Sequence, residues 1–383
     1  MNAAGTLLVC LAATAFAFVV YPAQSDPRPG YVGDAKCLSC HPKQKEFPRT
    51  AHHLTSQPAT RESIAGSFAP GKNLLKTPEP ELQYRMEARS DGFFQTGVLG
   101  TPPDTVSLSQ RFDLVVGSGR KGQTYLYWGE GNQLFQLPVS YWTSLGDWVN
   151  SPGYGDRVID FSRPVLPRCL ECHATYFEPV TDSAAPNRYR KTNYVVGVTC
   201  EKCHGPGAQH SSLNTAPAGQ SATKLTDQAI INPAKLPRDR QLALCSLCHG
   251  GVGVSKTPVF SFTAGNALED HLRLESPKPD EPLDVHGNQV ALLERSKCFQ
   301  NSNMTCSTCH DVHIPQRDVK DFASRCLTCH EVQSCGLFPR RGRSIAGKCV
   351  DCHLPNQTSN IIFSTHAGTR ITPKVRNHWI KVH

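Results

Sequence analysis

One five-residue pattern, Cys-x-x-Cys-His, constrains this 383-residue chain more than any other feature, because it occurs seven times and uses fourteen of the seventeen cysteines. So many repeats of one short pattern are far beyond chance, so every fold for this chain has to place seven similar sites. We number the motifs 1 to 7 in chain order: Cys37–His41, Cys169–His173, Cys200–His204, Cys245–His249, Cys306–His310, Cys326–His330 and Cys349–His353.

The spacing within each motif has a chemical reason. Two thiols three residues apart on one helical turn can reach the two vinyl groups of a single porphyrin, and the histidine that follows can bind the iron. Zinc is a competing interpretation, but zinc sites do not require a histidine after every cysteine pair. A thioredoxin-like site needs only one pair, within a βαβ pattern that this chain lacks. The motifs therefore predict seven covalently bound haem c groups.

The predicted attachment residues are Cys37, Cys40, Cys169, Cys172, Cys200, Cys203, Cys245, Cys248, Cys306, Cys309, Cys326, Cys329, Cys349 and Cys352. The predicted first iron ligands are His41, His173, His204, His249, His310, His330 and His353.

The second axial ligand of each iron has to come from outside the motifs. Nine of the sixteen histidines lie there, whereas Met86 and Met304 are the only methionines besides Met1. We therefore expect ligation by two histidines at most irons, which favours low redox potentials. The predicted second ligands are His52, His210, His271, His286, His313, His366 and His378; His53 and His383 are the two remaining histidines.

Two of these candidates follow a motif histidine closely. His210 comes six residues after His204, and His313 comes three after His310. A tether this short cannot reach around to the opposite face of the same porphyrin. We therefore expect each to bind the iron of a different motif.

The N-terminus resembles an export signal. Residues 7–20 form an uncharged run, too short for a comfortable membrane span, and Ala23-Gln24-Ser25 offers small residues for cleavage before Asp26. No basic residue precedes the run, which departs from the usual pattern, so a retained N-terminal anchor is the alternative. No later stretch is long and apolar enough to span a bilayer. We expect a periplasmic or otherwise extracytoplasmic protein without a stable membrane span after processing.

Composition bears on the partners and on the fold class. The formal charge of +8 comes without a basic run interleaved with aromatic residues, so nucleic acid is not an expected partner. The 29 Gly and 29 Pro predict much irregular structure. The expected fold consists mainly of short α-helices and irregular loops wrapped around stacked haems, with a small antiparallel β insert. The predicted segments are a signal peptide (1–25), a first haem segment (26–60), the β-rich insert (61–165) and a hexahaem domain (166–383).

The β insert fills the long gap between motifs 1 and 2. Short strand-like runs separated by Gly, Asp and Asn predict an antiparallel unit over Ser67–Tyr154. Within it, YLYWGEGNQLFQLPV predicts a hairpin with Gly-Glu-Gly-Asn at its turn. The insert could face a partner or substrate, or it could simply cover the haems.

Several stretches carry a resemblance to a known family. YVGDAKCLSCHPKQKEFPRTAHH (31–53), GVTCEKCHGPGAQH (197–210) and MTCSTCHDVH (304–313) resemble multihaem cytochromes c of the cytochrome c-554 and doubled-CXXCH type. GSGRKGQTYL and FQLPVSYW are similar to the haem portion of tetratricopeptide-linked multihaem cytochromes. The resemblance implies extracytoplasmic electron transfer between close haem pairs, and it favours His52 over His53 as a ligand. The family includes both carriers and enzymes.

Two classes of function are therefore open. The first is an electron carrier served by redox partner proteins, with a membrane quinol-oxidising complex as a candidate donor. The second is a multihaem oxidoreductase acting on a nitrogen or sulfur oxyanion, such as nitrite, hydroxylamine or a tetrathionate-like compound, at one open iron. His53, Arg49, Tyr125 and Tyr154 could serve such a site, although nothing in the sequence assembles them. No catalytic residue is predicted, and whether the chain is an enzyme stays uncertain, with electron transfer preferred.

Two further cysteines, Cys298 and Cys335, lie outside the motifs and flank the crowded C-terminal ones. In an oxidising compartment they could form a disulfide. Two unpaired thiols are the alternative.

Overall fold

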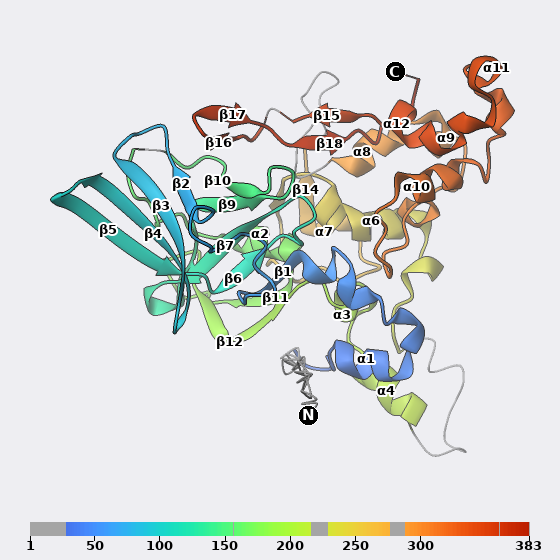
Figure 1. Cartoon of the computed structure of the whole chain (residues 1–383). Helices are drawn as coiled ribbons and strands as arrows, with labels where there is room; N and C mark the ends of the chain where they lie inside the picture. Colours follow the sequence, from blue (N-terminus) through green and yellow to red (C-terminus); the bar gives the residue numbers. More distant parts are fainter. Residues whose placement is uncertain (1–27, 156, 216–228, 276–287, 360, 383) are drawn as a thin grey trace, which may run out of the picture.

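The computed structural model describes residues 28–155, 157–215, 229–275, 288–359 and 361–382. The predicted signal peptide, His286 and His383 lie outside the described residues. Antiparallel sheets occupy one side of the molecule, and short helices with connecting loops occupy the other (Figure 1). No helix within the described residues has the length and apolar character to cross a membrane.

Two antiparallel sheets form the first side. A four-stranded sheet has the order β2-β3-β4-β5, and a six-stranded sheet has the order β1-β6-β7-β9-β10 with β8 paired to β7. Their bounds are β1 (Ser56–Pro58), β2 (Leu74–Lys76), β3 (Leu82–Arg89), β4 (Gly92–Thr101), β5 (Asp104–Arg111), β6 (Leu114–Val116), β7 (Gly122–Trp128), β8 (Leu134–Gln136), β9 (Val139–Trp142) and β10 (Asp147–Asn150). Strands β2 to β10 lie inside the range 61–165, and β1 lies just before it.

The sequence pattern explains these strands. In β3, Leu82, Tyr84 and Met86 are buried at every second position, as expected for a strand with one face on a core. The predicted hairpin is present: β7 pairs with β8, and the 3-10 turn Glu130–Asn132 connects them. Gly131 has a φ of 60° in this turn, a conformation that glycine adopts without steric cost.

The sheets enclose a hydrophobic core of their own. Trp148, Tyr84, Tyr125 and Met86 are at most 1% exposed and belong to one cluster of buried side chains. The indole nitrogen of Trp148 donates to the carbonyl oxygens of Ser67 and Lys72, which satisfies its one polar atom. A second cluster, around Phe177 and Tyr189, joins the sheets to motif 2.

The helical side is built from short elements. The longest described helix, α6, has 12 residues. The helices are α1 (Asp34–Cys40), α2 (Pro167–His173), α3 (Cys200–His204), α4 (Ala208–Thr215), α6 (Arg238–His249), α7 (Leu268–His271), α8 (Gln289–Glu294), α9 (Lys297–Gln300), α10 (Val319–Cys326), α11 (Phe338–Arg341) and α12 (Cys349–His353). The 3-10 helices are η1 (Pro42–Gln44), η2 (Phe47–Arg49), η3 (His53–Thr55), η4 (Glu130–Asn132), η5 (Pro233–Lys235), η6 (Cys306–Thr308), η7 (Val332–Ser334) and η8 (Gly342–Lys348).

Four two-stranded antiparallel ribbons lie among these helices: β11-β12, β13-β14, β15-β18 and β16-β17. Their bounds are β11 (Ala174–Pro179), β12 (Tyr189–Val196), β13 (Gly253–Ser255), β14 (Leu272–Leu274), β15 (Asn356–Thr358), β16 (Ser364–His366), β17 (Thr369–Ile371) and β18 (Lys374–Arg376).

The C-terminal part of the helical side has no comparable core. Among the described residues after 300, the buried hydrophobic side chains are Ala323, Ile345 and Val350. Large apolar side chains in the same segment are exposed: Val312, Ile314, Leu327, Leu337, Ile361, Phe363 and Val382. This segment carries motifs 5, 6 and 7, so apolar groups other than its own side chains have to fill its interior.

Candidate haem centres

Each motif sits on one helical turn. Motifs 3 and 7 coincide with α3 and α12, and motifs 2 and 4 end α2 and α6. In motifs 1, 5 and 6 the assigned helix stops earlier, yet the N–H of His41, His310 and His330 still donates to the carbonyl of the first motif cysteine at 2.9 to 3.0 Å. The two thiols and the imidazole of each motif therefore project from one turn, as attachment to one porphyrin requires.

The cysteines of the described residues are all unpaired thiols, including Cys298 and Cys335. Cys298 and Cys335 are therefore two unpaired thiols, which was the alternative to a disulfide. No three His, Cys, Asp or Glu side chains gather within the described chain where they could hold a metal ion together.

Four motif histidines face a histidine from elsewhere in the chain. The ring centres of His41 and His210 lie 6.1 Å apart, and those of His249 and His52 also lie 6.1 Å apart. The other two pairs are His204 with His313 at 6.2 Å and His310 with His378 at 6.3 Å. A metal–imidazole bond is about 2.0 Å long, so two imidazoles on opposite sides of one iron have ring centres roughly 6 Å apart. The four pairs fit this spacing.

Hydrogen bonds at Nδ1 orient several of these rings. The Nδ1 of His204 bonds the carbonyl oxygen of Ile231 at 2.8 Å, and that of His378 bonds the carbonyl oxygen of Arg376 at 3.2 Å. His353 of motif 7 makes the same contact with Lys381 at 2.8 Å, while His173 contacts the hydroxyl of Thr55 at 3.1 Å. Such a bond fixes the ring and directs Nε2 toward a metal.

Burial favours the neutral form of five of the paired histidines. Burial, with His249 nearby, lowers the pKa of His52 to about 4. Burial, with His378 as the next cause, lowers the pKa of His310 to about 4. Burial also lowers the pKa of His204, His249 and His378. A neutral imidazole is the form that binds iron, so these rings are suited to ligation.

Other histidines outside the motifs have different partners. The Nε2 of His53 contacts Asp34 at 3.0 Å, and that of His366 contacts Asp147 at 2.9 Å. Both ring nitrogens of His271 are within bonding distance of side chains, those of Thr257 at 3.0 Å and Asn266 at 3.3 Å. For His330 and His353, the described residues supply no second imidazole. The roles of His271, His286 and His366 stay predictions.

Thiols from different motifs are also neighbours. The helical turns that carry these motifs pack on one another: α1 on α3, α2 on α6, α6 on η6, and α10 on α12. Their thiols perturb one another's titration, and the neighbouring thiol of Cys248 lowers the pKa of Cys172 to about 7. Motif 1 thus adjoins motif 3, motif 4 adjoins motifs 2 and 5, and motif 6 adjoins motif 7.

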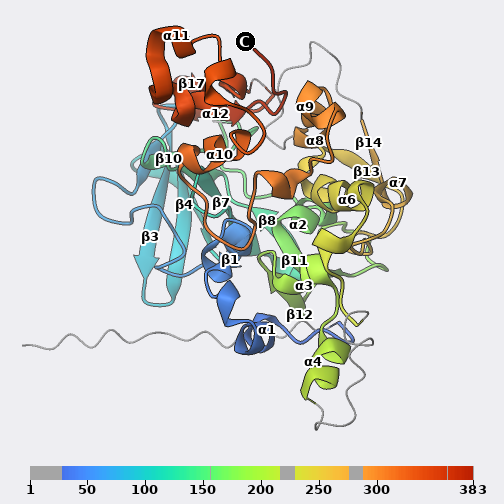
Figure 2. The same ribbon diagram turned by 90° about the vertical axis from the view of Figure 1, so that its right-hand side faces the viewer.

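Two weaker links connect these groups. Cys306, burial and Cys203 all raise the pKa of Cys245. The effect of Cys203 indicates that motif 3 lies near motif 4. The ring of Phe322, on α10, lies 5.1 Å from that of His310, which joins motif 5 to the helix of motif 6. In both views, α1, α3, α6, α10 and α12 follow one another from the bottom of the molecule to the top (Figures 1 and 2).

Two buried carboxylates that the sequence analysis did not single out connect motifs 1 and 3. Glu201, 2% exposed, accepts hydrogen bonds from the backbone N–H groups of Val32, Gly33 and Gly207 at 2.8 to 2.9 Å. In return, Asp34 accepts from the N–H of Cys200 at 2.8 Å. Burial opposes ionisation of Asp34, but its bonds to His53 and Cys200 outweigh burial and lower its pKa. Each of α1 and α3 therefore has its N-terminal turn fixed by a carboxylate from the other.

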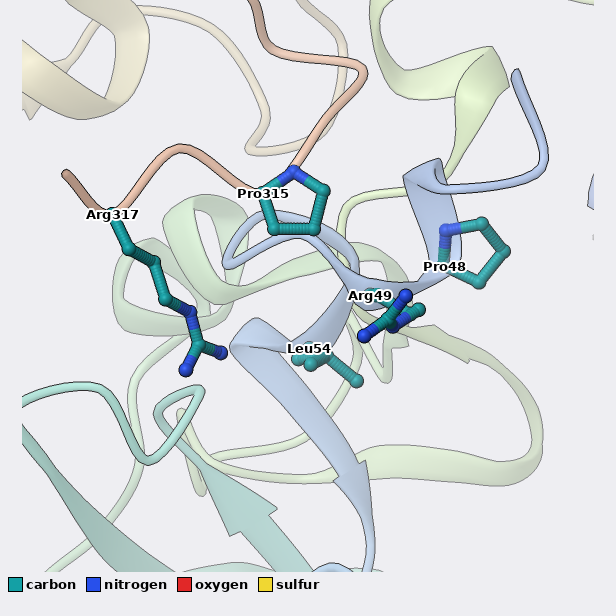
Figure 3. A pocket seen from close by; sticks show the side chains of 5 residues that line it. All are labelled: Pro48, Arg49, Leu54, Pro315 and Arg317. Carbon is teal, nitrogen blue, oxygen red and sulfur yellow. The ribbon is translucent and has the colours of Figure 1, made fainter. Parts of the chain in front are cut away.

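A pocket of about 450 Å³ is formed by two segments that each carry a paired histidine. It is lined by Pro48, Arg49, Leu54, Pro315 and Arg317, and the sticks in Figure 3 show the two guanidinium groups on either side of Leu54. His52 lies between Arg49 and Leu54 in the chain, and His313 precedes Pro315. Apolar walls with two cations suit the carboxylate-bearing edge of a porphyrin.

The residues considered for an oxyanion site do not come together. Tyr125 is fully buried in the core of the sheets, and its hydroxyl donates to Gln123 at 3.1 Å. The hydroxyl of Tyr154 donates to the carbonyl of Gln136 at 2.6 Å. His53 bonds Asp34, and Arg49 bonds Glu46 at 2.7 Å. These four side chains therefore have separate structural partners.

Comparisons with known proteins agree with the motif chemistry. The family model described as cytochrome c554 and c-prime matches residues 157–205, which contain motifs 2 and 3. The C-type polyheme cytochrome OmcC of Geobacter sulfurreducens is 27% identical over 51% of this chain and 27% of its own length. The multiheme cytochrome MtrA of Shewanella baltica is 21% identical over 48% of this chain and 46% of its own length.

The chain thus spans about a quarter of OmcC and less than half of MtrA. No solved structure matches it. The family model and these relatives confirm the resemblance to multihaem cytochromes c that was predicted from the sequence.

Proposed function

We propose that the chain is a heptahaem c-type cytochrome that transfers electrons outside the cytoplasmic membrane. The observation that carries the proposal is the set of four histidine pairs, His41/His210, His249/His52, His204/His313 and His310/His378, each at the spacing of two ligands on one iron. When bound, haem supplies reversible one-electron chemistry. An iron with two protein ligands has no open position for a substrate, which favours a carrier over an enzyme at these four centres.

The neighbouring thiols give the proposed order of the centres. Motif 1 adjoins motif 3, and motifs 3, 4, 5, 6 and 7 then follow in a row, while motif 2 lies beside motif 4. The row follows chain order except for motif 2, which lies beside motif 4 instead of between motifs 1 and 3. Neighbouring motifs would hold their porphyrins close together, as rapid electron transfer requires.

The protein's own residues hold this arrangement. The fourteen motif cysteines would attach the porphyrins, and the paired histidines would bind the irons through neutral imidazoles. Glu201 and Asp34 lock the turns of motifs 1 and 3 to each other. Arg49 and Arg317 would hold propionate groups in the pocket between the segments of His52 and His313. Donor and acceptor are redox proteins, and a membrane quinol-oxidising complex is one possible donor.

Adjacent histidines offer a matched test of the ligand pairs. In His52→Ala, the iron held by His249 should lose its second ligand, so the oxidised protein should gain a high-spin electron paramagnetic resonance signal and the reduced protein should bind additional carbon monoxide. In His53→Ala, which removes contacts to Asp34 and Phe47 but no paired imidazole, both signals should stay at the wild-type level. The haem content of both variants, measured as the pyridine haemochrome, controls for misfolding.

A His52→Ala protein with full haem content and wild-type spectra would show that His52 binds no iron. If His53→Ala instead produced the high-spin signal, the assignment of the two neighbours would be reversed. Either result would contradict the proposed pair of His249 and His52.

A further inference from the structure

The segment just before motif 7 carries an unusual concentration of unpaired positive charge. Arg340, Arg341, Arg343 and Lys348 are exposed, and no acidic residue occurs from Val332 to Val350. None of these four cations forms an ion pair with a residue that the structure describes. We call Arg340, Arg341, Arg343 and Lys348 the cationic cluster.

The cationic cluster lies at one end of the row of motifs. It belongs to α11 and η8, which pack on each other, and η8 packs against α10 and α12. These two helices carry motifs 6 and 7. In both ribbon views α11 is at the top of the molecule, and α1, with motif 1, is near the bottom (Figures 1 and 2).

Apolar surface accompanies the charge. Leu337 is 43% exposed directly before α11, and Leu327 of motif 6 is 38% exposed. Cys329 and His330 of the same motif are exposed as well. An apolar centre with a charged rim next to a redox site is suited to brief, salt-sensitive contact with a partner of opposite charge.

We propose that the cationic cluster is the docking surface for a redox protein whose own cofactor is surrounded by acidic side chains. The inference rests on the proposed function, because it needs electrons to pass through the end of the row at motifs 6 and 7. Four unpaired cations on one short segment attract an acidic surface and raise the rate of encounter, and added salt screens this attraction.

The test uses an acidic flavodoxin, reduced to its anionic hydroquinone, as the probe. Each hydroquinone is oxidised to the neutral semiquinone and delivers one electron, which reduces one haem iron from the ferric to the ferrous state. Stopped-flow absorbance would follow this reduction in wild type, in Arg340→Glu/Arg341→Glu/Arg343→Glu, and in Lys72→Glu/Lys76→Glu/Lys121→Glu. The control replaces exposed lysines on the β insert and changes the net charge by the same amount.

We expect the arginine variant to be reduced about tenfold or more slowly than wild type at low ionic strength, with the difference disappearing at high salt. The lysine control should stay within about threefold of wild type. Equal rates for wild type and the arginine variant at low salt would contradict the proposal, and so would equal slowing in both variants, because net charge alone would then suffice.

A second reductant separates docking from other roles of the arginines. The photogenerated neutral deazaflavin radical needs no charged surface, so it should reduce all three proteins at one rate. If it reduced the arginine variant more slowly, or if that variant lost haem, the arginines would serve the haems rather than a partner, and the docking proposal would fail. If neither donor reduced wild type, the proposed function itself would fail.

Discussion

The β insert and the C-terminal segment differ in what fills their interiors. The sheets over residues 56–150 enclose Trp148, Tyr84, Tyr125 and Met86, each at most 1% exposed. Residues 300–382 carry three motifs, but their described part buries only Ala323, Ile345 and Val350 among hydrophobic side chains. The first region therefore has the apolar burial that a fold needs, and the second has to obtain it from attached porphyrins.

This difference shows that two sources of stability coexist in one chain. Alternating burial along β3 and β4 organises the insert without any cofactor. The exposed apolar side chains around motifs 5 to 7 form surfaces without a protein partner among the described residues. We infer that the insert can form early and that the remainder becomes ordered as haem is attached.

Omitting haem attachment should produce the largest difference in stability between the β insert and the C-terminal segment. In protein produced without haem maturation, amides of β3, β4 and β7 should keep slow hydrogen exchange, whereas amides of α10 and α12 should exchange as in an unfolded chain. Mass spectrometry of peptides after timed deuteration measures both regions in one sample. Comparable protection in the two regions would show that the C-terminal segment has a sufficient core of its own.

Removing the largest buried side chain of the insert should have the next largest effect. Trp148→Ala should destabilise the sheets by about 3–5 kcal/mol, because it leaves a cavity and two carbonyl groups without their donor. Leu108, on β5, is 51% exposed, and Leu108→Ala should change the free energy of unfolding by no more than about 0.5 kcal/mol.

Denaturant unfolding followed by far-ultraviolet circular dichroism compares these two variants, and the Soret band reports the haem side separately. The Soret band of Trp148→Ala should persist beyond the unfolding of the sheets. Simultaneous loss of both signals would mean that the two regions share one cooperative core.

Breaking the carboxylate lock between motifs 1 and 3 should have a smaller effect. Glu201→Ala leaves three backbone N–H groups without an acceptor and should cost about 2–3 kcal/mol. Glu201→Gln keeps one acceptor oxygen and should cost less. The matched control is Glu46→Ala, which removes an exposed ion pair with Arg49 and should cost about 0–1 kcal/mol.

Thermal unfolding monitored at the Soret band measures these changes. Indistinguishable midpoints for Glu201→Ala and Glu46→Ala would show that the buried carboxylate does not hold the two motifs together.

Local features of the molecule were accessible from the sequence. The turn geometry of the motifs and the β7–β8 hairpin depend on residues within a few positions of one another, so spacing and turn residues predict them. The expectation that His210 and His313 would meet other motifs than their own also used only a local argument, the short tether. In the structure they face His41 and His204.

Long-range features were not accessible. The pairing of histidines joins residues that lie far apart in the chain, such as His41 with His210 and His310 with His378. Glu201 stands at a variable position of a motif, where nothing in one sequence distinguishes a buried hydrogen-bond acceptor from a surface charge. Glu171, at the other variable position of motif 2, is a second buried glutamate of this kind, since it accepts a backbone hydrogen bond from Phe260.

The central claim is that seven covalently attached porphyrins complete the interior of this chain. Intact-mass spectrometry of the purified protein under denaturing conditions tests it most directly, because thioether-bound haem stays with the polypeptide. The account predicts the mass of the processed chain plus seven haem groups. A mass equal to that of the polypeptide alone would contradict it.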